Sequence, residues 1–325
     1  MEISYPHEDY PTEGEGAVTE AEYAGGIGWG SASGLFGSPA DPAPLYLSGG
    51  NLWLRSGAAA RLCGVAYRNV DEPGGGDLMI TGIGANSGGA TRLDHIVVRL
   101  SWTTMLARHH VLTGVAGGAL PPITQQRGSG VFEISLGQLA IPAGGSVANA
   151  TLTRLGWYIG TDGDYVCTSA SRPPHAPGRR IWETDTSQGR VSTGGRWLLT
   201  AAPTTETVIN SALNHLTITT DSVLQQWGTG PGSEVTLRLG SFTRSGGSAV
   251  TPAQDLRLPA TVPVVARHPN RDQRMPVYLP GGYSGQLTIF SAGASTAGQI
   301  HLSSHPGIKV GDTILGTNVS WRIPD

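Results

Sequence analysis

The chain has 325 residues, enough for two or three domains, with 38% hydrophobic residues and a formal net charge of −3. Only 14% of the residues are charged and no basic patch stands out, which is atypical of nucleic-acid-binding proteins. The acidic N-terminus has no apolar segment and no run of about eighteen apolar residues follows, so we expect neither a secretory signal nor membrane insertion.

A short helix is predicted close to the N-terminus. Thr19 and Glu22 have capping-box spacing, in which each side chain bonds the backbone amide of the other residue. Glycines at positions 25, 26, 28 and 30 end this helix at once. Three prolines follow within residues 38–44 and indicate a linker, so we treat residues 1–44 as an N-terminal arm with a short helix.

From residue 45 onward the hydrophobic period is two, as in strands. Leucines alternate on both sides of Gly49-Gly50-Asn51, which predicts a hairpin. Regular spacing of strands and turns, without helical periods between them, predicts a β-sandwich over residues 45–156. Further strands are expected at residues 62–67, 78–83, 96–102 and 110–115, with a last pair of short strands within 131–141.

Residues 157–202 have few aliphatic side chains but three tryptophans, Trp157, Trp182 and Trp197. We expect so thin a segment to lack a core of its own. Wrapping around identical copies would cover its strand edges. The segment is therefore predicted to be a β connector that forms a homotrimer, with Trp182 and Trp197 buried near the axis; the alternative is that both are isolated surface tryptophans.

The C-terminal part, residues 203–325, alternates clearly, with Val235 and Leu237 apolar on one face, and predicts a second β-sandwich. Pro276 and Pro280 bracket an expected edge strand. Residues 205–216 also fit a helical stripe, so one helical turn at the start stays open. The predicted fold is all-β: two β-sandwich domains joined by a thin trimeric β connector, with a short N-terminal helix.

Several short motifs occur in a fixed order along the first part of the chain. RLDHIVVRLSW (92–102) is followed by PPITQ (121–125) and VFEISLGQL (131–139). CTS, RP, IWETDT and GRW follow between residues 167 and 197, and TEAEY stands at 19–23. Together these motifs resemble the opening and connector of siphophage baseplate and minor tail proteins, especially those of phages of actinobacteria. The C-terminal domain carries no such motif.

The resemblance implies a structural, non-enzymatic virion protein at the tail tip, made in the host cytoplasm. As a baseplate upper protein or tail fibre, it would link other tail or baseplate proteins to a host-facing C-terminal domain. Positions 179–180 and 187–189 depart from the connector pattern, which puts the detail of the connector in doubt. The residues expected to form the trimeric connector are Trp182, Trp197, Arg172, Glu183 and Asp185.

No motif for catalysis or cofactor binding is complete. Gly30-Ser31-Ala32-Ser33-Gly34 has alanine where a nucleophile elbow needs serine, and residues 82–87 form a broken GxGxxG that we interpret as a loop. The adjacent His109 and His110 would point to opposite faces of a strand. The two cysteines match no metal-ligand spacing. We therefore expect no catalytic residue, no metal and no cofactor.

Two alternatives remain open for function. The C-terminal domain could bind host cell-wall glycan, with aromatic rings stacking on sugars and Asn270 and Asp272 bonding their hydroxyl groups. The competing interpretation is that these rings are core or interface residues. A tail-associated glycan hydrolase would need two carboxylates across a cleft, which spacing alone cannot pair. The rings in question are Tyr283 and Phe290, with Trp227 and Tyr278 as further candidates.

Overall fold

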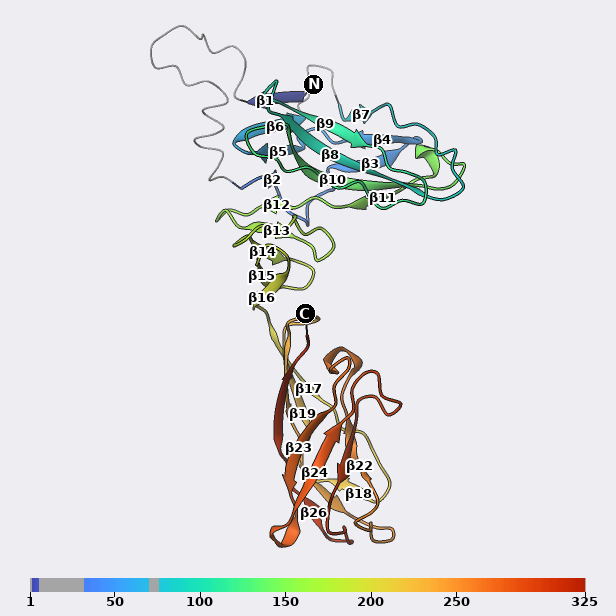
Figure 1. The fold of residues 1–325 in the computed structure, drawn as a ribbon, viewed down its shortest axis with the longest axis vertical. Coiled ribbons are helices and arrows are strands. Elements are labelled where there is room, and N and C mark those ends of the chain that lie inside the picture. The colour runs from blue at the N-terminus through green and yellow to red at the C-terminus, as the bar shows by residue number, and fades with distance from the viewer. Residues whose placement is uncertain (1, 6–31, 70–75, 325) are drawn as a thin grey trace. The chain divides into compact units, whose positions relative to one another are not determined.

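The computed structural model describes residues 2–5, 32–69 and 76–324, and it consists of strands joined by turns (Figure 1). The chain divides into two compact units, Met1–Trp197 (unit 1) and Leu198–Asp325 (unit 2), each with its own hydrophobic core. The predicted all-β class is confirmed. The helical turns within the described residues are three short 3₁₀ segments: η1 (Val147–Asn149), η2 (Val264–Ala266) and η3 (Pro280–Gly282). The predicted capping-box helix at Thr19–Glu22 lies outside the described residues.

The strands of unit 1 form one large sheet and two smaller ones; the last strand of the large sheet, β16, begins at the final residue of unit 1 and continues into unit 2. The large sheet has the order β1-β6-β5-β2-β12-β13-β14-β15-β16, and the others have the orders β11-β10-β8-β9 and β3-β4-β7. The bounds are β1 (Glu2–Tyr5), β2 (Gly34–Leu35), β3 (Leu45–Ser48), β4 (Asn51–Leu54), β5 (Ala59–Leu62), β6 (Val65–Asn69), β7 (Leu78–Ile80), β8 (Arg92–Ser101), β9 (Leu106–Leu112), β10 (Val131–Ile141), β11 (Thr151–Arg154), β12 (Tyr158–Ile159), β13 (Tyr165–Cys167), β14 (Arg180–Glu183), β15 (Gln188–Ser192) and β16 (Trp197–Ala201).

Glycine-rich turns set the strand pairing in the first part of unit 1. The predicted hairpin is confirmed, because β3 and β4 pair antiparallel around Gly49 and Gly50, whose φ angles are 57° and 76°. The single strand predicted at residues 62–67 is wrong, since a second hairpin turn divides it between β5 and β6. That turn contains Cys63, with a φ of 48°, and Gly64. A cysteine gives no sequence signal for this left-handed conformation.

The two short strands predicted within residues 131–141 are instead one strand, β10, which pairs with β8 along its whole length. Its register shifts between Ser135 and Gly137, so the glycine marks a bulge and not a break. A Cβ atom at position 137 would lie only 2.9 Å from the Thr153 carbonyl oxygen. A close approach of β11 therefore requires glycine there.

Residues 157–197 share the core of the preceding strands. Trp157, Tyr158, Tyr165, Ile181 and Trp197 all belong to the same buried cluster as the side chains of β4, β6, β8 and β10. The expectation that this segment lacks a core without other copies of itself is therefore corrected. Its sparse aliphatic residues suffice because large aromatic side chains pack against the earlier part of the same chain.

Unit 2 contains three sheets within the described residues, of orders β17-β19-β20-β27, β22-β25-β24-β23 and β18-β21-β26. Its core receives side chains from all three. The bounds are β17 (Thr204–Val208), β18 (Leu216–Ile218), β19 (Val223–Trp227), β20 (Glu234–Arg238), β21 (Phe242–Arg244), β22 (Leu256–Thr261), β23 (Gln273–Tyr278), β24 (Ser284–Ile289), β25 (Gln299–Ser303), β26 (Thr313–Ile314) and β27 (Asn318–Arg322).

The alternation predicted for unit 2 is confirmed, with Val235 and Leu237 buried and Arg238 exposed. An edge strand does lie here, since β23 is the last strand of its sheet, but its predicted bounds are wrong because Pro276 lies inside β23 and does not precede it. No helical turn occurs at the start of unit 2, where residues 204–208 form β17. The apolar residues there have helical spacing in the sequence, but the backbone is extended because β17 pairs with β19 along its full length.

Candidate interaction surfaces

A buried carboxylate, Glu183 at the end of β14, holds the predicted connector together. The Arg172 Nε atom donates to Glu183 Oε1 at 2.6 Å, and the Arg190 Nε atom lies 3.0 Å from the same oxygen. The Thr186 hydroxyl donates to Glu183 Oε2 at 2.9 Å. A buried charge is tolerated only when it is paired in this way, so these contacts fix the segment against β15.

Two further titratable groups, the Asp185 carboxylate and the Cys167 thiol, lie close to Glu183 in the sequence or in space. The amide and hydroxyl of Ser169 donate to the Asp185 carboxylate at 2.9 and 2.6 Å. Partial burial would raise the pKa of Asp185, but hydrogen bonds from Ser169 and from the backbone amides of Asp185 and Thr186 together lower the pKa. Burial, and then the negative charge of Glu183, raises the pKa of Cys167 to about 12. The Cys167 thiol is therefore protonated at neutral pH and is no nucleophile.

The two tryptophans predicted at a trimer axis have different environments. Trp197 is 9% exposed and packs against the His175 ring at a centroid distance of 5.1 Å, so it belongs to the core of its own chain. Trp182 is 43% exposed, and its cross-strand neighbour on β15 is Gly189, which has no side chain to cover it. The axial placement of Trp197 is thus corrected. Trp182 remains available for contact with another chain.

A serine and a histidine in unit 1 have the contacts of a nucleophile and its base. His95 Nε2 lies 2.7 Å from Ser135 Oγ, and His95 Nδ1 lies 2.8 Å from the Pro121 carbonyl oxygen. Because a carbonyl only accepts, Nδ1 carries the proton and Ser135 donates to Nε2. Burial lowers the pKa of His95, which favours this neutral form.

Residues 121–125 cover this pair. The carboxylate of the neighbouring Glu133 accepts from the Thr124 amide at 2.7 Å and from Arg99 Nε at 2.7 Å. Both Ser135 and His95 are buried. The contacts join β8, β10 and residues 121–125 beneath the surface.

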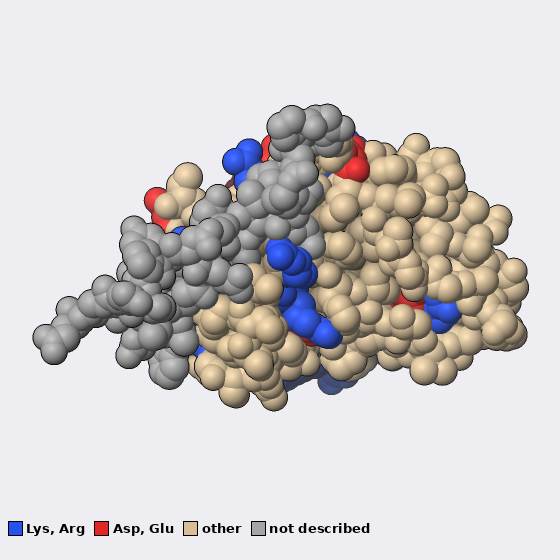
Figure 2. All heavy atoms as spheres, turned by 90° about the horizontal axis from the view of Figure 1, so that it is seen from above, with Lys and Arg blue, Asp and Glu red and all other residues tan. Residues whose placement is uncertain are grey.

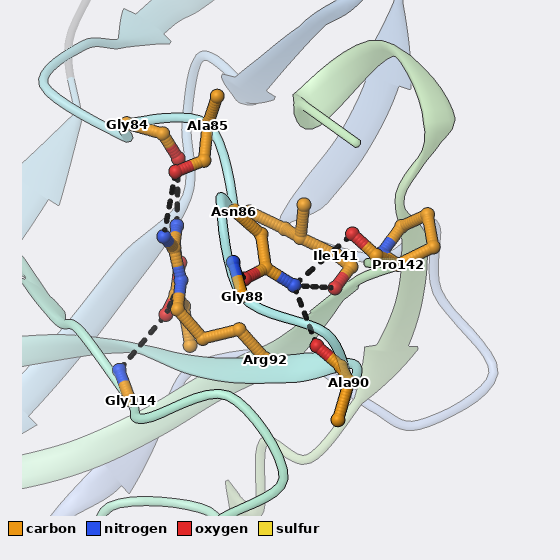
Figure 3. Close-up of polar contacts among 10 residues, drawn as sticks. Gly84, Ala85, Asn86, Gly88, Ala90, Arg92, Gly114, Ile141 and Pro142 are labelled. Carbon is orange, nitrogen blue, oxygen red and sulfur yellow. Dashed lines mark hydrogen bonds and ion pairs between the residues drawn. The ribbon is translucent and has the colours of Figure 1, made fainter. Parts of the chain in front are cut away.

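The broken glycine motif at residues 82–87 forms a loop, as predicted, and buried polar side chains hold it (Figure 3). The Asn86 amide nitrogen donates to the carbonyl oxygens of Ala90, Ile141 and Pro142 at 2.8 to 3.0 Å. The Arg92 guanidinium donates to Gly84 and Ala85, and it pairs with the buried Asp94 at 2.8 Å. Asp94 in turn accepts from the Gly114 amide at 2.9 Å. These groups fasten the loop and leave no phosphate-binding turn.

The residues predicted for glycan contact do not form one site. Tyr283 and Phe290 stand just beyond opposite ends of β24. Phe290 is half-buried and packs edge-on against His301 at 5.0 Å. Asn270 and Asp272 lie at the Phe290 end, because Asp272 accepts from the Ser291 amide at 2.8 Å.

A second exposed tyrosine of this hairpin is Tyr278. Tyr278 closes β23, and its register partner is Ser284, the residue after Tyr283. The two rings are 73% and 57% exposed. Sequence alternation along β23 places Tyr278 outward, opposite to the buried Val277. Tyr278 shares this face with Ser284, so Tyr283, one residue earlier, lies toward the opposite face of the hairpin.

Charged groups on the surface are sparse. On the face seen in Figure 2, basic atoms form small separate groups with no continuous basic track among the described residues. No group of three or more His, Cys, Asp or Glu side chains in the described ranges could hold a metal ion. Among the same residues, no helix has the length and apolar character needed to span a membrane.

No family model, curated protein or solved structure matches this chain.

Proposed function

We propose that the chain is a structural, non-enzymatic component of a phage-type tail tip that works as a homotrimer. In this proposal the N-terminal arm, residues 1–44, attaches to other tail proteins, residues 157–202 supply the trimer contacts, and residues 203–325 face the host. The sheets of each unit would pack as a β-sandwich around the buried cluster of that unit.

Trp182 is the observation that carries the proposal. Trp182 is 43% exposed, and tryptophan side chains are enriched at the centres of protein interfaces. Its strand, β14, is fixed by the buried Glu183 network directly beside it. A rigid strand that presents an uncovered aromatic ring is suited to contact an identical copy without loss of conformational freedom.

The motif residues behind the phage resemblance contact one another inside the chain. Arg172 and Glu183 form an ion pair in the connector, and Arg92 and Asp94 form another in the first motif. Their role in holding strands and loops is what a load-carrying virion protein requires. The covered Ser135–His95 pair and the protonated Cys167 thiol likewise favour a structural role over catalysis.

Size-exclusion chromatography with light scattering tests the proposed oligomer. The full chain should elute as one species of about 101 kDa, three times the 33.7 kDa of the single chain. A single 33.7 kDa species at micromolar concentration would contradict the trimer. Antibodies against the purified chain test the location, because they should label the tail tip of phage particles in electron micrographs. Labelling of the capsid alone would contradict the proposed location.

A further inference from the structure

The sheet β17-β19-β20-β27 of unit 2 has one face that is open to solvent. Along β20 the side chains of Val235 and Leu237 enter the core, so the alternate residues of this strand point away from it. The register of the three strand pairs extends this division across the whole sheet. The outward residues stand at even positions of β17, β20 and β27 and at odd positions of β19, and all of them are partly or fully exposed. We call this set of residues the outer platform.

Trp227 provides an aromatic ring at one end of the outer platform. Its register partner on β17 is Thr204, and its register partner on β20 is Glu234. Side chains directly opposite one another on antiparallel strands have Cβ atoms about 4.5–5.5 Å apart, so hydroxyl, indole and carboxylate form one row. Thr204 and Glu234 are exposed and Trp227 is partly exposed. The sheet therefore covers part of the ring, and the rest can contact a ligand.

The indole N–H of Trp227 is also available to a ligand. Four other tryptophans donate this hydrogen to a backbone carbonyl oxygen of the chain: Trp53, Trp102, Trp157 and Trp321. Among the described residues, no group accepts from the indole of Trp227. A hydroxyl group of a ligand could accept this hydrogen at the edge of the ring.

Polar side chains fill the next row of the outer platform. The Gln225 Nε2 atom donates to Glu206 Oε1 at 3.0 Å, and the hydroxyl oxygens of Thr236 and Ser320 lie 2.8 Å apart. One hydroxyl of this pair donates to the other, so together they keep one hydrogen and several lone pairs for a ligand. These contacts order the polar groups in advance, which reduces the entropy lost on binding.

The charges of the outer platform balance. Its charged side chains are two acids and two arginines: Glu206, Glu234, Arg238 and Arg322. The Arg238 guanidinium donates to Glu206 Oε1 at 2.7 Å. A further acid, Asp221, stands before β19, at the end opposite to Trp227, and accepts from Asn210 at 2.6 Å. A platform without net charge has no field that would attract an anionic or a cationic polymer.

We propose that the outer platform binds a neutral carbohydrate, with Trp227 stacking on a sugar ring and with Glu234, Gln225 and the Thr236–Ser320 pair bonding hydroxyl groups. The proposal rests on the proposed function only in that residues 203–325 face the host. Sugars present an apolar ring face and hydroxyl edges, and an indole ring beside ordered polar groups complements this pattern.

The size of the outer platform favours a saccharide over a second protein. Each of the four strands has five residues. Strands about 4.8 Å apart, with a rise of about 3.3 Å per residue, make a face of roughly 250 Å². A stable protein interface buries roughly 800 Å² per partner, several times this area.

Affinity electrophoresis of the full chain tests this site. The gels would contain a soluble neutral galactan, glucan or mannan, with polygalacturonate as the charged comparison. The wild-type chain should be retarded by at least one neutral polymer. Trp227→Ala should weaken that binding about tenfold or more, equivalent to about 1.4 kcal/mol, whereas Trp227→Phe, which keeps an aromatic face, should stay within about threefold of wild type.

A second variant keeps the test independent of the fold, because the sheet partly covers Trp227. Ser320→Leu removes a hydroxyl group and adds bulk at an exposed position of β27, where substitutions usually change stability by less than about 0.5 kcal/mol. It should also weaken binding. Tyr278→Ala is the matched control, because Tyr278 is an exposed aromatic residue of the same unit on a different sheet, and its loss should leave binding unchanged.

Circular dichroism of each variant checks folding. Retardation by polygalacturonate alone or no retardation by any neutral polymer would overturn the proposal. Folded Trp227→Ala and Ser320→Leu chains that bind like wild type would overturn it too, as would an equal loss of binding in Tyr278→Ala.

Light scattering separates this inference from the proposed function. If Trp227→Ala and Ser320→Leu lose the oligomer, the outer platform is an interface between copies and the carbohydrate site is refuted. If wild type binds a neutral polymer through Trp227 but is monomeric, the site stands and the trimer does not. If wild type is trimeric but the two variants bind normally, the trimer stands and the site does not.

Discussion

Replacing Trp182 by alanine should separate assembly from folding, because this side chain is 43% exposed in the single chain whereas Trp197 is only 9% exposed. Trp182→Ala removes a ring that is only partly covered in its own chain, so it should cost unit 1 less stability than Trp197→Ala does. Trp197→Ala opens a cavity beside His175 and should cost about 3–5 kcal/mol of stability. Trp182→Ala should therefore mainly weaken assembly, whereas Trp197→Ala should mainly lower the stability of unit 1.

The loss on assembly can be worked from the exposure. A large aromatic side chain buries about 150–250 Å², and 43% of that area is still free on Trp182. At about 25 cal/mol per Å², covering it contributes about 2 kcal/mol per subunit, or about 6 kcal/mol per trimer. That corresponds to about four powers of ten in the trimer dissociation constant. Because the midpoint concentration scales with the square root of this constant, it should rise about a hundredfold.

Sedimentation velocity over a dilution series measures the midpoint directly. Met79→Ala is the matched control, since Met79 is another large hydrophobic residue of unit 1 with comparable exposure but lies on β7, in a different sheet. The wild type and Met79→Ala should dissociate at the same concentration. A Trp182→Ala chain that remains trimeric at wild-type concentrations would refute the assignment of Trp182 to the interface, as would an equal effect of the methionine variant.

Three further predictions concern the interior. Glu183→Gln should destabilise unit 1 by about 3–5 kcal/mol in chemical denaturation, because two arginines lose a buried anion. The control Glu206→Gln removes an exposed ion pair with Arg238 and should cost less than about 1 kcal/mol. Equal losses of stability in the two variants would contradict this prediction. Cys167, with its pKa raised to about 12, should resist iodoacetamide at pH 8 until the chain unfolds, so rapid labelling of the native chain would disagree. Burial lowers the pKa of His95, so the unfolded state binds more protons once the pH falls below about 6.5. Unit 1 should lose stability from there down to the folded pKa, and His95→Asn should flatten that part of the profile; an unchanged slope would exclude His95 as its source.

Local patterns in the sequence were sufficient to predict the class of fold, one hairpin turn and one edge strand. The period of two through residues 235–239 predicts which side chains are buried, because successive side chains on a strand alternate between faces. Gly49 and Gly50 predict their hairpin, because few other residues adopt two successive left-handed conformations. Pro276 predicts an edge strand, because it lacks the amide hydrogen that a central strand donates.

Contacts between residues far apart in the sequence could not be predicted from local patterns. Residues 157–197 contain too few aliphatic side chains to form a core by themselves. The tertiary structure packs Trp157 and Trp197 into the same core as β8 and β10. The Ser135–His95 contact joins residues forty positions apart, and it arises because β10 pairs antiparallel with β8. Likewise, the pairing of β23 with β24 sets Tyr278 opposite Ser284 and leaves Phe290 at the other end of the hairpin. Alternation along one strand specifies a face, but only the register between strands decides which side chains meet on it.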